Sequence, residues 1–285
     1  MDLLALSHLE RCDLLDGETA RVTAWLRSLD PGALDGPAIG DWTIRQVVAH
    51  LVGVAEFYAG NVERGAAGDI EPPKGRPPAG SMRGASAAAG VAAGAAALAE
   101  ATAADPIGAF ERSAAALAER LRSLGPDQLD LPGYHPGGLL PLNRFLLLRA
   151  KELCVHDWDL RAPTDPSARI SDLGVAAVLL IIDERIASGS LRWAYQPDAA
   201  VDEPVRIHVR LDGGAWDRVV TVDHDTVEIE PETSEGAAPS GRVSGEGEAF
   251  VRLVYGRAGT SGTLAGLEVE PASLAPRLTR WFGGI

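Results

Sequence analysis

The sequence predicts an α plus α+β protein, with a four-helix bundle over residues 1–165 and a smaller α+β domain over residues 170–285. Three observations lead to this fold class. Apolar residues recur at helical spacing through most of the first 165 residues. The segment Ala162-Pro-Thr-Asp-Pro166 then interrupts the pattern. Beyond it, apolar and polar residues alternate as they do in half-buried strands.

The first half contains four long helical segments. The first covers residues 3–28 and ends at Asp30-Pro31-Gly32. After a second helix and a Pro/Gly-rich loop over residues 65–80, an Ala-rich helix covers residues 84–103, breaks at Asp105-Pro106 and resumes to Leu124. The last helix runs from Pro141 to Leu160. Long helices joined in this way favour an antiparallel bundle.

The second helix has a complete start signal. Thr43-Ile-Arg-Gln46 has the sequence of a capping box, in which Thr43 accepts from the Gln46 amide and Gln46 accepts in return. We therefore predict a helix from Ile44 to Arg64.

The second half mixes helices and strands. An apolar helix is predicted over residues 171–188, and helices also over Ala249–Val254 and Pro271–Phe282. Alternating patterns predict strands over Val205–Leu211, Trp216–Val222 and Val227–Glu230. The turn sequence Asp212-Gly-Gly214 joins the first two strands.

The charge balance excludes several classes of partner. The chain has 26 Lys and Arg residues against 40 Asp and Glu residues, a net charge of −14. Nucleic-acid binding needs clustered positive charge, so we expect no nucleic-acid partner. Anionic membranes attract basic segments, so we expect no membrane partner. Two cysteines are too few for a disulfide framework, and no basic segment precedes the first apolar residues, so we expect a cytoplasmic protein.

The most informative segment lies on the last helix of the bundle. Arg149, Glu152, His156 and Asp159 are spaced by three, four and three residues, which places them on one stripe of a helix. Apolar residues border this stripe: Leu142, Leu146, Leu153 and Leu160 on one side, and Leu148 and Val155 on the other. We therefore expect the stripe to face inward. Glu152 and His156 could then bind one metal ion, zinc or another divalent first-row metal.

A third ligand would have to come from a neighbouring helix, and His50 on the capped helix is the candidate. Explanations that need no metal ion are also available for these residues. A histidine among apolar residues is more often a hydrogen-bonded core residue, and a Glu/His pair four residues apart is more often a solvated pair. Both alternatives weaken once Arg149 and Asp159 extend the same stripe.

Cys154 and Arg257 are two further residues of types that can carry chemistry. Cys154 is two positions from both Glu152 and His156, so it points away from the stripe, as a small core residue does. Arg257 could hold an anionic substrate, although a plain surface role fits it equally well.

These residues resemble a known family. Asp41-Trp-Thr-Ile-Arg-Gln-Val-Val-Ala-His50-Leu is similar to its W-[ST]-x-x-x-x-x-x-H-L element, and the segment from Arg149 to Leu160 is similar to its R-x-x-E-x-x-x-H-x-x-D-L element. The family is the mycothiol-dependent maleylpyruvate isomerases. The resemblance implies a DinB-like metal-binding four-helix bundle and a C-terminal domain like sterol carrier protein. Leu253-Val-Tyr-Gly-Arg257 resembles that domain's L-x-x-G-R element.

The resemblance also implies a chemistry. Zinc would be held by His50, Glu152 and His156, and mycothiol, a low-molecular-weight thiol, would be the cosubstrate. Arg149 and Asp159 would lie at the cofactor site, where they would orient the side chains that bind the metal. Arg149 and Arg257 would be the catalytic residues. We expect the metal at the end of the bundle nearest residues 65–80 and 131–140, with Arg257 reaching the substrate there.

The reaction stays open between two outcomes. A zinc-bound thiol is deprotonated and can add to an activated double bond of a small electrophile. Rotation and elimination give a cis–trans isomerase, whereas addition alone gives a thiol S-transferase. Two other classes also remain: a metal-dependent hydrolase, and a non-catalytic module that binds a metal or ligand. The sequence leaves the substrate, the native metal and the oligomeric state open.

Overall fold

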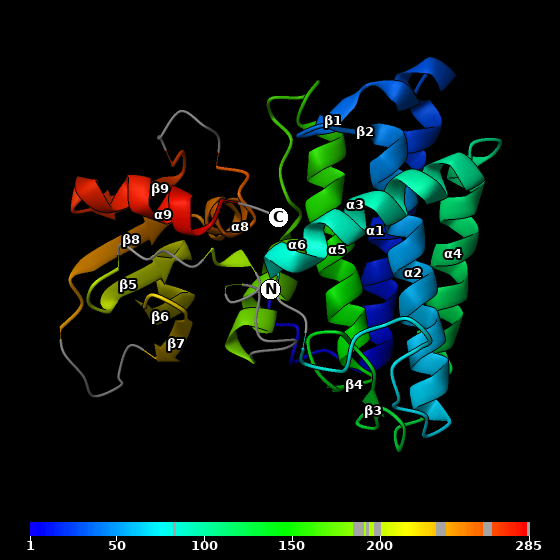
Figure 1. The fold of residues 1–285 in the computed structure, drawn as a ribbon, viewed down its shortest axis with the longest axis horizontal. Helices are drawn as coiled ribbons and strands as arrows, with labels where there is room; N and C mark the ends of the chain where they lie inside the picture. Colours follow the sequence, from blue (N-terminus) through cyan, green and yellow to red (C-terminus); the bar gives the residue numbers. More distant parts are fainter. Residues whose placement is uncertain are drawn as a thin grey trace. The chain divides into compact units, whose positions relative to one another are not determined.

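The computed structural model describes residues 1–81, 84–184, 191, 194–196, 201–231, 238–258 and 264–283. The chain divides into two compact units, one formed mainly by residues 1–177 and the other mainly by residues 178–285. The division falls within helix α6 (Asp172–Asp183). Figure 1 shows the elements of each unit.

Four helices form the bundle of the first unit: α1 (His8–Ser28), α2 (Ile44–Ala66), α4 (Pro106–Arg122) and α5 (Arg144–Arg161). Helices α1 and α2 each pack against both α4 and α5. The core between them consists of apolar side chains such as Val22, Leu51, Leu117 and Leu153, all buried. The predicted helix bundle is therefore confirmed.

The Ala-rich segment divides into two separate helices at the predicted break. Asp105 accepts a hydrogen bond from the Gly108 amide at 3.0 Å, and Pro106 occupies the first turn of α4. Helix α3 (Gly84–Ala101) instead crosses the bundle obliquely (Figure 1). It meets α2 at Gly53, where a β-carbon would lie 3.3 Å from Leu98. Small side chains thus let α3 lie close against the bundle.

Capping boxes start two of the bundle helices. Thr43 and Gln46 make the predicted reciprocal hydrogen bonds at the start of α2. Ser7 and Glu10 form a second capping box, so α1 begins at His8 rather than at residue 3. Short strand pairs lie in the connections, β1 (Pro37–Ile39) with β2 (Trp42–Thr43), and β3 (Pro132–Gly133) with β4 (Leu140–Pro141).

The second unit contains a five-stranded sheet with the order β7-β6-β5-β8-β9. Strands β5 (Val205–Leu211), β6 (Trp216–Val222) and β7 (Val227–Pro231) form the predicted antiparallel meander. The sequence did not predict β8 (Gly241–Gly245), which pairs parallel to β5, or β9 (Leu267–Glu270), which pairs antiparallel to β8.

The helices of the second unit match the sequence prediction in part. Helix α8 (Gly247–Val254) has its predicted place, and α9 (Ala275–Trp281) follows a short 3-10 turn within the predicted Pro271–Phe282 segment. The helix predicted over residues 171–188 corresponds to α6, which covers Asp172–Asp183. Residues 185–188 of that prediction lie outside the described residues. Among the described residues, no helix combines the length and apolar character needed to span a membrane.

Candidate metal centre

Helices α2 and α5 run antiparallel and bring three side chains to one point. His50 lies in the second turn of α2, and Glu152 and His156 lie one turn apart on α5. The Glu152 Oε2 atom is 3.2 Å from His50 Nε2 and 3.4 Å from His156 Nε2. The two imidazole rings meet edge to face, with centroids 4.8 Å apart. The sequence-predicted ligands therefore lie together.

This geometry fits a divalent metal ion. Zinc binds nitrogen and oxygen ligands at about 2.0–2.1 Å in a tetrahedral arrangement, which separates neighbouring ligand atoms by about 3.3 Å. The two carboxylate–imidazole distances match that separation. The three ligand atoms all lie within 4.8 Å of one another, and no other group of three such residues is found in the described part of the chain. Two imidazoles and one carboxylate are a donor set suited to zinc and similar metals.

Asp159 determines which ring nitrogen of His156 points toward Glu152 and His50. Its buried carboxylate accepts a hydrogen bond from His156 Nδ1 at 2.8 Å, so Nε2 is the nitrogen that points to Glu152. Burial alone would lower the pKa of His156, but the hydrogen bonds to Asp159 and Glu152 outweigh it and raise that pKa above 6.5. A carboxylate–histidine pair of this kind commonly fixes the ring of a metal ligand.

The charges of His50 and Glu152 are set by burial and by their neighbours. Burial lowers the pKa of His50 below 6.5, which favours the neutral ring that binds metals. Burial would raise the pKa of Glu152, but the Lys151 ammonium and the two histidines hold it well below 4.5. At neutral pH the cluster therefore offers an ionised carboxylate.

Arg149 lies in the interior of the bundle. Its guanidinium donates to the backbone carbonyl of Leu51 at 2.8 Å and lies 5.8 Å from the centre of the Phe110 ring. Burial lowers the pKa of Arg149 to about 10, so it remains charged at neutral pH. The contact joins α5 to α2 at the residue next to His50.

Arg257 belongs to the second unit, whereas His50, Glu152 and His156 belong to the first. Its guanidinium donates to the carbonyl of Tyr255, two residues earlier, and lies 6.0 Å from the centre of the Tyr255 ring. The side chain is thus folded back on its own loop.

Both cysteines lie away from the cluster. Cys154 is buried and accepts a hydrogen bond from Ser171 Oγ at 3.4 Å, and Cys12 is buried beside His8. Burial raises the pKa of Cys154 to about 12 and that of Cys12 to about 11. Neither thiol is therefore ionised at neutral pH.

The expected position of the cluster along the bundle was wrong for residues 65–80, whereas His135 of residues 131–140 does lie near it, within electrostatic reach of Lys151 and Glu152. Residues 65–80 follow the far end of α2, whereas His50 lies near its start, with its ring centroid 5.7 Å from that of Trp42. The antiparallel pairing places the beginning of α2 beside the later turns of α5, and so fixes the cluster there.

The sequence alone gives no role to two residues that lie near the cluster, Lys151 and His135. The Lys151 ammonium contacts Glu152 Oε1. His135 packs against Tyr58 and Phe145, and burial with the nearby Lys151 charge lowers its pKa to about 3. Its Nδ1 accepts from the Gly137 amide at 3.0 Å, so the neutral ring carries its proton on Nε2. A loop histidine has no helical spacing to reveal it, and Lys151 is off the polar stripe.

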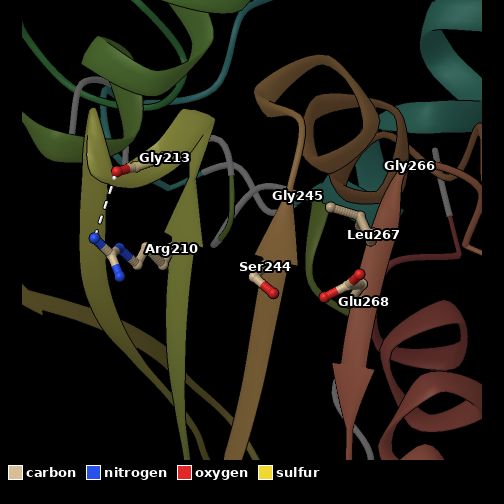
Figure 2. A pocket seen from close by; sticks show the side chains of 7 residues that line it. All are labelled: Arg210, Gly213, Ser244, Gly245, Gly266, Leu267 and Glu268. Atoms are coloured by element: carbon tan, nitrogen blue, oxygen red, sulfur yellow. Dashed lines mark hydrogen bonds between the residues drawn. The ribbon is translucent and has the colours of Figure 1, made fainter.

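The second unit has a groove of its own, about 670 Å³ in volume. Figure 2 shows its lining at one end of β5, β8 and β9. Arg210, Ser244 and Glu268 occupy one row across these three strands, because their backbones are paired in register. Leu267 and three glycines complete the lining, and none of His50, Glu152 and His156 belongs to it.

Comparisons with known proteins agree with this architecture. The family model for the mycothiol maleylpyruvate isomerase N-terminal domain matches residues 15–161, a segment that includes all three cluster residues. A crystal structure of the mycothiol-dependent maleylpyruvate isomerase and one of its histidine-to-alanine variant both superpose with a TM-score of 0.64. Each is 17% identical to this chain, and the match covers 95% of this chain and 96% of the other.

At that identity the structural likeness shows a shared fold along nearly the whole chain. No match was found among curated proteins. The family model itself covers more than half of the 285 residues. This chain therefore belongs to the mycothiol maleylpyruvate isomerase family.

Proposed function

We propose that this chain is a zinc- and mycothiol-dependent enzyme that adds a thiolate to an electrophilic small molecule. The observation that carries the proposal is the convergence of His50, Glu152 and His156 on one point, with no fourth metal-ligating side chain in the group among the described residues. Three protein ligands and one open position are the pattern of catalytic zinc sites. Family membership and the shared fold support the identity of the thiol.

The bound metal supplies one function, which is to deprotonate a coordinated thiol whose ordinary pKa is about 8.5. The protein residues do the rest. His50, Glu152 and His156 hold the ion. Asp159 keeps the His156 proton on Nδ1 and so leaves the Nε2 lone pair available. Arg149 positions α5 against α2 next to His50.

Addition of the thiolate accounts for either reaction. The sulfur forms a bond to one carbon of a cis double bond, and the electron pair moves onto the adjacent activating group. The former double bond is then single and rotates. Expulsion of the thiolate gives the trans isomer, whereas protonation of the adduct gives a conjugate. We propose Arg257 as the residue that holds an anionic substrate, because its L-x-x-G-R context resembles the family element and arginine binds carboxylates in a bidentate manner.

The test measures metal content and thiol dependence together. Purified protein should contain about one zinc per chain and should convert maleylpyruvate, or conjugate a related electrophile, only when mycothiol is present. Glutathione should substitute poorly, since it lacks the sugar and inositol hydroxyls. His156→Ala should lose metal and turnover together while its circular dichroism stays that of the folded protein.

Three results would contradict the proposal. Turnover of a hydrolysable substrate without thiol would indicate a metal-dependent hydrolase. Bound metal with no turnover of any electrophile would indicate a binding module. Full metal content in a folded His156→Ala protein would remove this cluster as the metal site.

A further inference from the structure

The two oxygen atoms of the Glu152 carboxylate have different surroundings. Oε2 faces both imidazoles, at 3.2 Å from His50 and 3.4 Å from His156. Oε1 faces the ammonium of Lys151. Only one oxygen of this carboxylate is therefore presented to the point where the three ligands converge.

The contact with Lys151 requires a particular side-chain path. Consecutive residues on a helix do not face one another, so the lysine side chain has to fold back along α5 to reach its neighbour's carboxylate. The Lys151 side chain is only 15% exposed, close to the 16% of Glu152. The ammonium is thus held against the cluster rather than extended into water.

The residue type at this position stands out in the composition. Lys74 and Lys151 are the only lysines in the chain, and the other 24 basic residues are arginines. A guanidinium fork tends to hold both oxygens of a carboxylate, whereas an ammonium is a compact point charge that can hold one. A lysine can therefore occupy Oε1 and leave Oε2 for a metal ion.

We propose that Lys151 is a positioning residue that keeps Glu152 a one-oxygen metal ligand, so that the fourth coordination position stays open to an external anion. This inference rests on the metal site of the proposed function. A carboxylate can bind a metal through one oxygen or both, and a second oxygen would take up coordination space needed by the incoming thiolate. The charge-assisted hydrogen bond from Lys151 holds Oε1 away from that role.

The same ammonium favours anionic ligands. Its positive charge balances the negative charge of Glu152, so the charge of a bound divalent ion remains available to an incoming thiolate or carboxylate. The site then attracts anions locally although the chain carries a net charge of −14. Asp159 contributes one negative charge, but it is directed to the far nitrogen of His156.

The test uses full-length protein loaded with Co²⁺, whose visible absorption reports coordination number. Wild-type protein should bind one Co²⁺ per chain with the intense bands of four-coordinate cobalt. Adding 2-mercaptoethanol should produce a sulfur-to-cobalt charge-transfer band. In Lys151→Met the visible bands should weaken to the intensity of five-coordinate cobalt, and thiol binding should weaken about tenfold, within the range for residues that support metal ligands.

Matched variants separate charge from fold. Lys151→Arg keeps the positive charge, but its guanidinium fork tends to hold both carboxylate oxygens and so competes for Oε2; it should therefore lower the Co²⁺ affinity below that of the wild type. Lys74→Met removes the other, exposed lysine and should behave as wild type. Circular dichroism checks that each variant is folded, and Lys151→Gln, which is polar but uncharged, replaces Lys151→Met if that protein does not fold.

Each remaining outcome has a defined meaning. An unchanged cobalt spectrum and thiol affinity in the folded Lys151→Met or Lys151→Gln protein would overturn the role of Lys151. Loss of Co²⁺ binding in that folded variant would also overturn it, because Lys151 would then be needed for ligation itself. Failure of the wild-type protein to bind Co²⁺ would instead contradict the metal site of the proposed function.

Discussion

At the scale of single residues, the buried carboxylate of Asp159 decides which nitrogen of His156 is presented for binding. Asp159→Asn removes the charge that favours a proton on Nδ1, while it keeps the size of the side chain. Outer partners of metal-binding histidines typically contribute 10–100-fold in affinity, so we predict a loss in that range, about tenfold or more. Competition with a chromophoric chelator measures it.

Asp165→Asn is the control for this prediction, because Asp165 lies just after α5 and its carboxylate bonds to the nearby Ser167. It should leave the metal affinity unchanged. Equal affinity in Asp159→Asn and wild-type protein would show that the contact does not support the metal site.

The two cysteines give a second prediction at this scale. Because burial raises the pKa of Cys154 to about 12 and that of Cys12 to about 11, both stay as thiols at neutral pH, and thiols are poor nucleophiles. We expect neither to react with iodoacetamide at pH 7.5 until the protein is unfolded. Mass spectrometry of the treated native protein measures this. Rapid alkylation of Cys154 with loss of turnover would favour an internal nucleophile over an external thiol.

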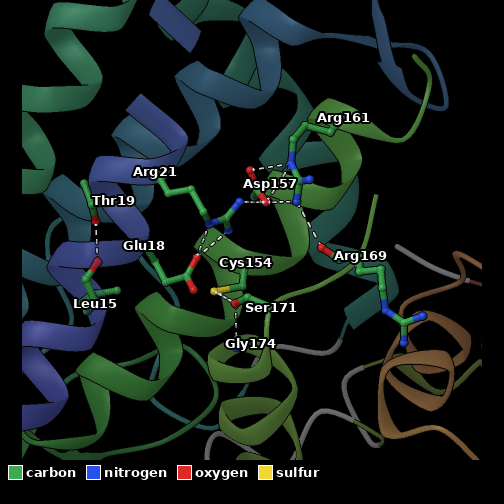
Figure 3. Close-up of polar contacts among 10 residues, drawn as sticks. All are labelled: Leu15, Glu18, Thr19, Arg21, Cys154, Asp157, Arg161, Arg169, Ser171 and Gly174. Carbon is green, nitrogen blue, oxygen red and sulfur yellow. Dashed lines mark hydrogen bonds and ion pairs between the residues drawn. The ribbon is translucent and has the colours of Figure 1, made fainter. Parts of the chain in front are cut away.

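At the scale of elements, an ion-pair network around the buried carboxylate of Asp157 joins α1 to α5. Figure 3 shows Asp157 between Arg21 of α1 and Arg161 of α5. The Asp157 side chain is completely buried, and Arg21 also binds Glu18. Arg161 in addition donates to the backbone carbonyl of Arg169 after α5.

Removing Asp157 should destabilise the bundle. A buried charge that loses its partner costs about 3–5 kcal/mol. Arg21 is 41% exposed and can regain water, so we predict a smaller loss for Asp157→Ala, about 1–3 kcal/mol in the free energy of unfolding. Urea unfolding measures it. Glu111→Ala breaks the exposed pair with Arg27 and should cost clearly less, because water screens that pair. Equal losses in the two variants would contradict a special role for the network.

The elements differ in how well local sequence predicts them. The capping box at Thr43 and the break at Asp105-Pro106 are local signals, and both appear in the structure as predicted. Strands β8 and β9 have only five and four residues and are flanked by glycines or loops. Each acquires its partners from distant strands, β8 from β5 and β9 from β8, so no local pattern specifies them.

The residues of the candidate site also differ in how well local sequence predicts their positions. The spacing of Glu152, His156 and Asp159 is a property of one helix, and the structure brings their side chains together. The position of His50 along α5 depends on how the two helices pair, and our expectation that residues 65–80 lie at the cluster's end of the bundle was wrong. His135 reaches the same region from a loop whose path only the folded backbone defines.

At the scale of the whole molecule, all three cluster residues belong to one of the two compact units. A metal ion held by them links α2 to α5, and metal binding to the folded state adds to its stability. We predict that chelation will speed amide hydrogen exchange in α2 and α5 and leave the β5 and β6 amides unchanged. Hydrogen-exchange mass spectrometry checks this. A uniform change in both units, or none in α2 and α5, would contradict it.

The central claim is that His50, Glu152 and His156 hold a metal ion whose open position accepts an external thiol. Zinc K-edge X-ray absorption of the native protein, with and without mycothiol, tests it most directly. Without thiol, we predict only nitrogen and oxygen neighbours at about 2.0–2.1 Å, and with mycothiol a sulfur neighbour should appear at about 2.3 Å. A sulfur neighbour before thiol is added, or none after it, would contradict the claim.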